Sequence, residues 1–220
     1  MISGRWPAGS PAHIMLVPDR CGTMSGARAG KGTTKNVSLA EVEGAMRGDH
    51  DAFAALIGAS ANRSFALACL ILRDQDRAED ATQEAIVRAW RELPRLRDAS
   101  RFDAWLRRLV VNACYDEARR VRRRAEVSLL NRSDRSSADP SRVVLERDRV
   151  ERAFRRLPLE QRTVLALQHY FELSHVEIAA TLDLPIGTVK SRIRYSSAAM
   201  RAALAADDRT TSEAADGRTA

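Results

Sequence analysis

The chain has 220 residues, room for one large domain or two small ones, and its 36 Lys and Arg residues outnumber 29 Asp and Glu residues for a net charge of +7. That excess suits a polyanionic partner without identifying it. Three widely spaced cysteines, with no histidine near them, exclude a zinc site and favour a reducing cytoplasm over a disulfide framework.

The N-terminal segment, residues 1–37, is rich in Gly, Ser, Ala, Pro and Thr and lacks helical periodicity. We expect it to be a disordered extension, and translation could start at Met1, Met24 or Met46. It has no apolar core of the secretory-signal kind, and no apolar run of about 18 residues follows it in the chain. We therefore expect a cytoplasmic protein without membrane insertion.

Residues 38–124 have a helical pattern almost throughout, which predicts a first helical domain. A helix predicted from Arg77 to Leu93 places Ala81, Ala85, Ile86, Ala89 and Leu93 toward the core. Its other face carries Asp80, Gln83, Glu84 and Val87. An acidic face on a basic protein fits a basic protein partner, and a plain solvated face accounts for the same periodicity.

The next predicted helix runs from about Arg101 to Arg122, with a core stripe of Phe102, Leu106, Leu109, Val110 and Ala113. An adjoining strip of this helix carries Trp105, Arg108, Asn112, Tyr115 and Arg119. Aromatic, basic and amide side chains in one strip are the mixture that holds single-stranded nucleic acid by stacking and phosphate contact. Taken singly, Trp105 and Tyr115 also fit the edge of a core.

The composition changes at residues 125–141, where Ser, Asp and Pro replace the apolar residues, so we predict a flexible linker there. A second helical domain is predicted over residues 142–204, followed by a disordered tail over 205–220. Nothing in the chain alternates in the manner of a strand-containing fold. The predicted fold is therefore all-α, with two small helical domains joined by a flexible linker.

The second domain contains the pattern of a helix-turn-helix. Ser174 and Glu177 form a capping box, Asp183-Leu184 ends that helix, and Pro185 is expected as the first residue of the next. One face of this second helix is predicted to be buried: Val189, Ile193, Ser196, Met200 and Leu204. The opposite face carries Gly187, Lys190, Ser191 and Arg194, a small and basic surface of the kind that enters a DNA major groove.

Three segments of this domain resemble region 4 of extracytoplasmic-function sigma factors, members of the sigma-70 family: Leu-Pro-Leu-Glu-Gln-Arg at 157–162, Glu-Ile-Ala at 177–179 and Gly-Thr-Val-Lys-Ser-Arg at 187–192. Luminescence-regulator-type response regulators carry a string similar to the last. The resemblance implies that this domain binds the minus-thirty-five promoter element. The residues implied are Gly187, Thr188, Lys190, Ser191, Arg192 and Arg194.

The first domain resembles region 2 of the same family. Residues 78–84, Ala-Glu-Asp-Ala-Thr-Gln-Glu, are similar to the segment that docks on the clamp coiled coil of the largest polymerase subunit, although Ile86 stands where the family usually has Phe. The docking residues implied are Asp80, Gln83, Glu84 and Val87. Phe-Asp-Ala-Trp-Leu at 102–106, with Asn112, Asp116 and Arg119-Arg120, is similar to the segment that melts the minus-ten element. The minus-ten residues implied are Trp105, Arg108, Asn112, Tyr115, Arg119 and Arg120.

The resemblance implies a promoter-specificity sigma factor that binds core RNA polymerase through its clamp coiled coil and flap, and promoter DNA both as duplex and as melted strand. It also implies a possible anti-sigma factor and association with the nucleoid when bound to polymerase. No catalytic constellation, cofactor or metal site is predicted. Two alternatives remain open: a stand-alone helix-turn-helix regulator that binds duplex DNA without polymerase, and a recombinase-like enzyme with a helix-turn-helix tail.

Overall fold

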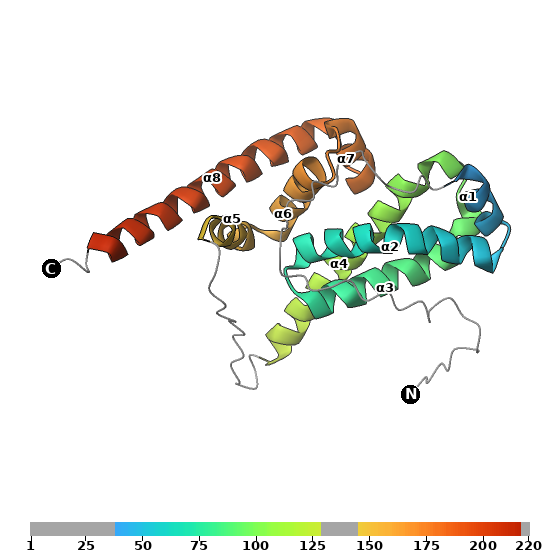
Figure 1. The fold of residues 1–220 in the computed structure, drawn as a ribbon, viewed down its shortest axis with the longest axis horizontal. Helices are drawn as coiled ribbons and strands as arrows, with labels where there is room; N and C mark the ends of the chain where they lie inside the picture. Colours follow the sequence, from blue (N-terminus) through green and yellow to red (C-terminus); the bar gives the residue numbers. More distant parts are fainter. Residues whose placement is uncertain (1–37, 129–144, 217–220) are drawn as a thin grey trace.

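The computed structural model describes residues 38–128 and 145–216, and every regular element in those two stretches is helical (Figure 1). The predicted all-α fold is confirmed there. The predicted N-terminal extension, residues 1–37, and most of the predicted linker lie outside the described residues. We call residues 38–128 the first block and residues 145–216 the second block.

The first block consists of four α-helices and two short 3-10 turns. In chain order these are α1 (Leu39–Met46), α2 (His50–Leu72), α3 (Gln75–Glu92), η2 (Leu93–Arg95), η3 (Ala99–Arg101) and α4 (Phe102–Ser128). Carboxylates cap two of the helices, because the Asp49 side chain accepts a hydrogen bond from the N–H of Asp51 at 2.9 Å and Asp74 accepts one from the N–H of Arg77 at 3.1 Å. Such caps satisfy backbone donors that the first turn leaves unpaired.

The core of the first block lies between α2, α3 and α4, which pack against one another, with α4 crossing the other two at a slant (Figure 1). α2 contributes large side chains, and α3 contributes small ones: Ala78, Ala81, Ala85 and Ala89 are all buried. Small residues along one face let the backbone of α3 approach its neighbours closely. The core stripe predicted on α4 is confirmed, since Phe102, Leu106, Leu109, Val110 and Ala113 are buried.

By length and composition alone, α2 is the one helix among the described residues that could cross a membrane. Asn62 and Arg63 interrupt its apolar run, which is why the sequence showed no unbroken span. Phe53, Leu56 and Leu67 of this helix are among the most deeply buried side chains of the chain. In this fold α2 is therefore the core helix of the first block.

The second block consists of α5 (Leu145–Arg156), α6 (Leu159–Leu165), a turn of π-helix η4 (Ala166–Tyr170), α7 (His175–Leu182) and α8 (Ile186–Asp216). The predicted capping box is confirmed, because Ser174 and Glu177 bond each other's backbone N–H groups. α7 ends at Asp183, whose φ of 55° is left-handed. α8 begins at Ile186, one residue later than expected, and the carbonyl of Pro185 accepts the N–H of Val189 at 3.1 Å.

Two helices extend beyond the predicted limits of their domains. α4 continues to Ser128, past residue 124, and α8 continues to Asp216, past residue 204. Residues 125–128 and 205–216, predicted as parts of the linker and the tail, are thus helical. Uninterrupted helix-forming residues such as Ala205 and Ala206 favour such continuation. The domain boundaries themselves remain predictions.

The two blocks pack directly against each other. α7 contacts α4, and α6 and η4 contact α2, so that a single hydrophobic cluster runs from Val42 in α1 to Ile193 in α8. The sequence predicted two domains on a tether and gave no indication of this junction. α8 lies along the outer edge of the second block and extends away from the first (Figure 1).

Candidate functional site

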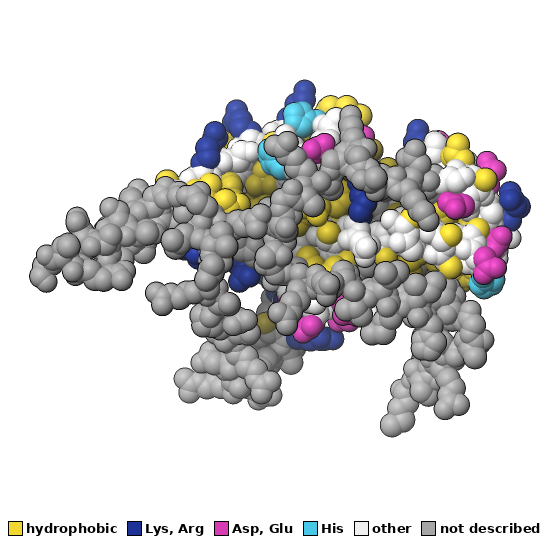
Figure 2. Space-filling model, in the orientation of Figure 1, with side chains coloured by type: hydrophobic (Ala, Val, Ile, Leu, Met, Phe, Trp, Pro, Cys, Tyr) yellow, Lys and Arg dark blue, Asp and Glu magenta, His cyan; other side chains and the backbone are white. Residues whose placement is uncertain are grey.

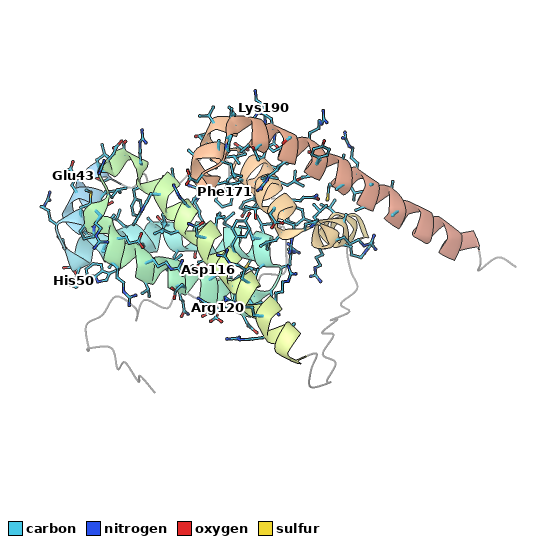
Figure 3. The ribbon with its side chains drawn as sticks, turned by 180° about the vertical axis from the view of Figure 1, so that it is seen from behind. Glu43, His50, Asp116, Arg120, Phe171 and Lys190 are labelled. Atoms are coloured by element: carbon cyan, nitrogen blue, oxygen red, sulfur yellow. The ribbon has the colours of Figure 1, made fainter. Side chains whose placement is uncertain are left out.

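The outer face of α8 carries four of the six residues predicted to contact duplex DNA. Gly187, Lys190, Ser191 and Arg194 are exposed, and Lys190 stands on the outer edge of the molecule (Figure 3). Figure 2 shows Lys and Arg side chains in dark blue along this upper edge. Thr188 and Arg192 are half-buried on the flank of the helix. Burial raises the pKa of Tyr115 on α4, and the positive charge of Arg192 opposes that rise.

Packing on the opposite side orients this face. Val189 and Ser196 are fully buried and Ile193 is 8% exposed, which holds α8 on α6 and α7. A Cβ added at Gly187 would meet nothing within 4 Å, so the fold itself does not require glycine there. A small residue at that position instead leaves room for a partner to approach the helix closely.

Two exposed residues next to this face were not predicted. Tyr195 is 60% exposed, with the Arg194 guanidinium 5.2 Å from its ring centroid, and Ile186 is 42% exposed at the start of α8. Tyr195 follows Ser191 by four positions, which places the two on the same side of the helix. That spacing is the signal in the sequence that could have identified it.

The six residues predicted to contact the melted minus-ten strand, the five of the strip and Arg120, all lie on α4, but their surroundings differ. Asn112 and Arg119 are exposed. Trp105 is half-buried, and its ring centroid lies 6.0 Å from that of Phe102. Arg120 is half-buried and pairs with Glu117 at 3.2 Å.

The other two strip residues contact the second block. Nη2 of Arg108 lies 2.9 Å from Oδ2 of Asp183, the residue that ends α7. Tyr115 packs against Thr163 of α6, and burial raises the pKa of its phenol. In this structure the strip is therefore partly covered by the chain itself.

The four residues predicted to dock on polymerase share one side of α3. Asp80 and Gln83 are exposed, and Gln83 Nε2 donates to Glu79 Oε1 at 3.2 Å. Glu84 and Val87 are half-buried. Glu84 is also structural, because it accepts a hydrogen bond from Arg88 Nε at 3.0 Å.

Arg88 also joins α3 to α4, because its Nη1 lies 2.9 Å from Oδ2 of Asp116. The hydrogen bond with Asp116 raises the pKa of Arg88. Burial works to raise the pKa of Asp116, but its hydrogen bonds with Arg119 and Arg88 outweigh burial and hold that pKa below its ordinary value. Asp116 and Arg120 lie near each other on α4 (Figure 3).

Within the described residues, no three His, Cys, Asp or Glu side chains gather as metal ligands would. Cys69 and Cys114 are both buried, and burial raises the pKa of the Cys114 thiol to about 12. A thiol with that pKa is a poor nucleophile at neutral pH. The chemistry of the surface is that of binding: an exposed basic face, a strip of aromatic and basic residues, and an acidic and amide face.

Comparison with known families gives the same division of the chain. Residues 56–124 match sigma-70 region 2, and residues 147–196 match sigma-70 region 4. The first match covers α3 and most of α2 and α4, and the second covers the helix-turn-helix.

Several sigma factors are similar to the chain over most of their length. The RNA polymerase sigma-H factor of Pseudomonas aeruginosa is 32% identical over 166 residues, covering 69% of this chain and 86% of that protein. The ECF sigma factor SigW of Bacillus subtilis is 31% identical over 70% of this chain and 90% of that protein, and SigL of Mycobacterium tuberculosis is 32% identical over 76% and 96%.

Two solved structures also have a fold similar to that of this chain. The structure of CnrH in complex with the cytosolic domain of CnrY has a TM-score of 0.59 and 27% identity, covering 78% of this chain and 99% of that one. RpoE of Bartonella quintana, solved with the anti-sigma factor NepR, shares the fold with a TM-score of 0.59. The chain therefore belongs to the extracytoplasmic-function sigma factors of the sigma-70 family, non-enzymatic RNA polymerase subunits that direct transcription initiation.

Proposed function

We propose that three surfaces divide the work of this sigma factor. Asp80, Gln83, Glu84 and Val87 on α3 dock on the clamp coiled coil of core polymerase, the outer face of α8 enters the major groove of the minus-thirty-five element, and the α4 strip holds the melted minus-ten strand. The observation that carries this assignment is that three chemically distinct surfaces lie on three different helices, each in the region that the family matches cover.

The chemistry of each surface supports its role. Lys190 and Arg194 are exposed on α8 within reach of base edges and phosphates, with Gly187 beside them. Exposed Asn112 and half-buried Trp105 offer an amide and an aromatic ring to an unpaired base. Thr188 and Arg192 lie on the flank of α8, so we assign them to phosphate contacts rather than to base reading.

The matches over both blocks set aside the two alternative functions. A self-standing duplex-binding regulator has no use for a region 2 domain, and a recombinase-like enzyme has no place in a chain covered by two sigma-70 regions. A sigma factor acts where RNA polymerase acts, in the cytoplasm, and we propose nucleoid association when it is bound to polymerase. Because CnrH was solved with CnrY and RpoE with an anti-sigma factor, we also propose an anti-sigma partner here, and the polymerase flap as the partner of the second block.

Reversing a charge on α3 tests polymerase docking. Asp80→Arg should abolish co-purification with core polymerase, because an acidic contact on a basic partner becomes repulsive. Asp80 makes no ion pair among the described residues, so the fold should survive. Glu43→Arg, an equal charge change at an exposed site on α1, is the control and should leave binding intact. Equal binding by both variants would refute the α3 assignment.

Alanine substitutions on α8 test upstream recognition. Lys190→Ala and Arg194→Ala should each weaken promoter binding by about 1–3 kcal/mol and relax sequence preference where the side chain reads a base. A residue that contacts only phosphate should instead weaken all sequences alike and reduce the salt dependence. Arg201→Ala removes the same charge from an exposed site further along α8 and serves as the control. Undiminished promoter selection by holoenzyme with either variant would contradict the groove assignment.

A further inference from the structure

Lysine is scarce in this chain, and one of its few lysines stands within the exposed outer face of α8. The sequence has three lysines, Lys31, Lys35 and Lys190, among 36 Lys and Arg residues, so nearly all of its positive charge is arginine. Lys190 is the one lysine in the part of the chain that the structure describes. Its side chain is exposed and stands on the outer edge of the molecule (Figure 3).

This scarcity matters because the two basic side chains differ in reactivity. A lysine amine accepts an acyl group and loses its charge, whereas an arginine guanidinium stays protonated in proteins and keeps its charge. The cysteines of the described residues are poor competitors, because Cys69 and Cys114 are both buried and burial raises the pKa of the Cys114 thiol to about 12. Within residues 38–128 and 145–216, Lys190 therefore supplies the one side-chain amine that an acyl donor can modify.

The surroundings of Lys190 on α8 are positive. Residues 186–206 contain four basic side chains and no carboxylate. Arg194 and Arg201 follow Lys190 by four and eleven positions, which places all three within about 40° of one another on the helix, and all three are exposed. None of them is in an ion pair among the described residues. A row of uncompensated cations attracts small phosphate-bearing anions as well as DNA phosphates.

We propose that Lys190 is an acylation site, at which an acyl phosphate switches off recognition of the upstream promoter element. The neutral Nε amine attacks the carbonyl carbon of the acyl phosphate and forms a C–N bond. The bond from that carbon to the phosphate oxygen breaks, inorganic phosphate leaves with the electron pair, and the nitrogen passes its proton to water. The amide is uncharged, so α8 loses a cationic contact. The switching rests on the proposed role of the α8 face, whereas the acylation itself does not.

Acylation should change the surface of α8 without changing its fold. The Lys190 side chain is exposed, and the buried side chains of Val189 and Ile193 hold the helix on α6 and α7. The arginines along the same face keep their charge under the same treatment. One reaction therefore removes one contact at a defined position, and the thermal unfolding of the modified chain should match that of the unmodified chain.

The test treats the full-length chain with acetyl phosphate, removes the reagent and adds untreated core polymerase. Lys31→Arg and Lys35→Arg, present in every variant, leave Lys190 as the one lysine. Mass spectrometry of peptides should find acetyl groups at Lys190. Holoenzyme with a chain made with Nε-acetyllysine at position 190 should bind promoter DNA about five- to 150-fold more weakly, and a lysine deacetylase should restore the affinity.

Three variants serve as controls. Lys190→Arg keeps the charge without an amine, so its promoter affinity, whatever its starting value, should not change on treatment. Adding Arg201→Lys to that variant offers an amine at an exposed site further along α8, which should be acetylated without loss of affinity. Arg194→Ala should slow the reaction of Lys190 with acetyl phosphate about threefold, because a cation one turn away attracts the anion. Its reaction with a neutral N-hydroxysuccinimide ester should be unaffected.

The outcomes separate this inference from the proposed function. If acetyl phosphate leaves Lys190 unmodified while Lys190→Ala loses promoter affinity, the acylation site is overturned and the groove contact stands. If neither acetyllysine at position 190 nor Lys190→Ala weakens promoter binding, the switching is overturned together with the groove contact of Lys190. An equal loss of affinity on acetylation of the Arg201→Lys variant overturns the assignment of the switch to Lys190.

Discussion

Arg88 is a residue whose role depends on contacts that no local pattern reveals. It pairs with Glu84 one turn earlier on α3 and with Asp116 on α4, at 3.0 and 2.9 Å. The first contact follows from the four-residue spacing, but the second joins residues 28 positions apart. Glu84, for which the resemblance to region 2 implies a contact with polymerase, therefore also belongs to a network that holds two helices of the first block together.

Removing the Asp116 carboxylate tests this network. Asp116→Asn should lower the free energy of unfolding by about 1 kcal/mol at pH 7, because a partly buried charged hydrogen bond from Arg88 and an exposed one from Arg119 weaken. The folded pKa of Asp116 lies below its ordinary 3.8, so the wild-type advantage should be constant above about pH 5. This advantage should decline as the pH falls through the lower pKa of the folded state. Below that pKa, Asp116 is protonated in both the folded and the unfolded protein.

Urea unfolding of both proteins from pH 7 down to pH 3 measures that difference. Asp103→Asn, which alters an exposed carboxylate on the same helix, is the control and should show a smaller effect. An advantage that persists unchanged at the lowest pH would mean that ionised Asp116 does not stabilise the fold.

At the scale of single helices, the sequence predicted most of what the structure has. The capping box at Ser174, the break at Asp183 and the buried stripe of α4 follow from local chemistry and a period of 3.6 residues. The stripe predicted on α8 is buried at Val189, Ile193 and Ser196, whereas Met200 and Leu204 are half-buried. Residues between a buried and an exposed face were harder to place. Thr188 and Arg192 belong to the predicted motif, yet they lie on the flank of α8, because the facing of a border residue depends on which neighbouring helix covers it.

The contribution of the α7 capping box to stability can be measured by removing the Ser174 hydroxyl. The Ser174 hydroxyl accepts the N–H of Glu177 at 3.3 Å, and the Glu177 carboxylate accepts the N–H of Ser174 at 2.8 Å. Ser174→Ala should lower the free energy of unfolding of the second block by about 1 kcal/mol. Ser197→Ala, inside α8, should be neutral or stabilising since alanine is the better helix former. Equal effects of the two changes in chemical denaturation would contradict a capping role.

At the scale of the whole molecule, the sequence predicted two domains but not their contact. Arg108 and Asp183 are 75 positions apart, and each has an ordinary local reason for its charge: a basic strip on α4 and a helix end on α7. Non-local pairing of this kind leaves no periodic trace in one sequence. The strip could therefore be predicted from composition and facing, whereas its partial coverage by α6 and α7 could not.

The two blocks share one hydrophobic cluster, so we expect them to unfold as one cooperative unit. Ile178, Val164 and Leu167 are fully buried in the second block and belong to that cluster. Ile178→Ala should destabilise that block by about 2–5 kcal/mol through the cavity it leaves. Because the cluster continues into the first block, that block should be destabilised together with the second.

Two probes distinguish the blocks in a urea titration. Trp90 and Trp105 both lie in the first block, so with Trp6 changed to Phe their fluorescence follows that block alone, while far-ultraviolet circular dichroism follows both. In Ile178→Ala both signals should move to lower urea together, since coincident probes mark one cooperative unit and the hydrophobic cluster runs through both blocks. An early dichroism transition that the fluorescence lacks would show instead that the blocks unfold separately and that the apolar contacts between them contribute little.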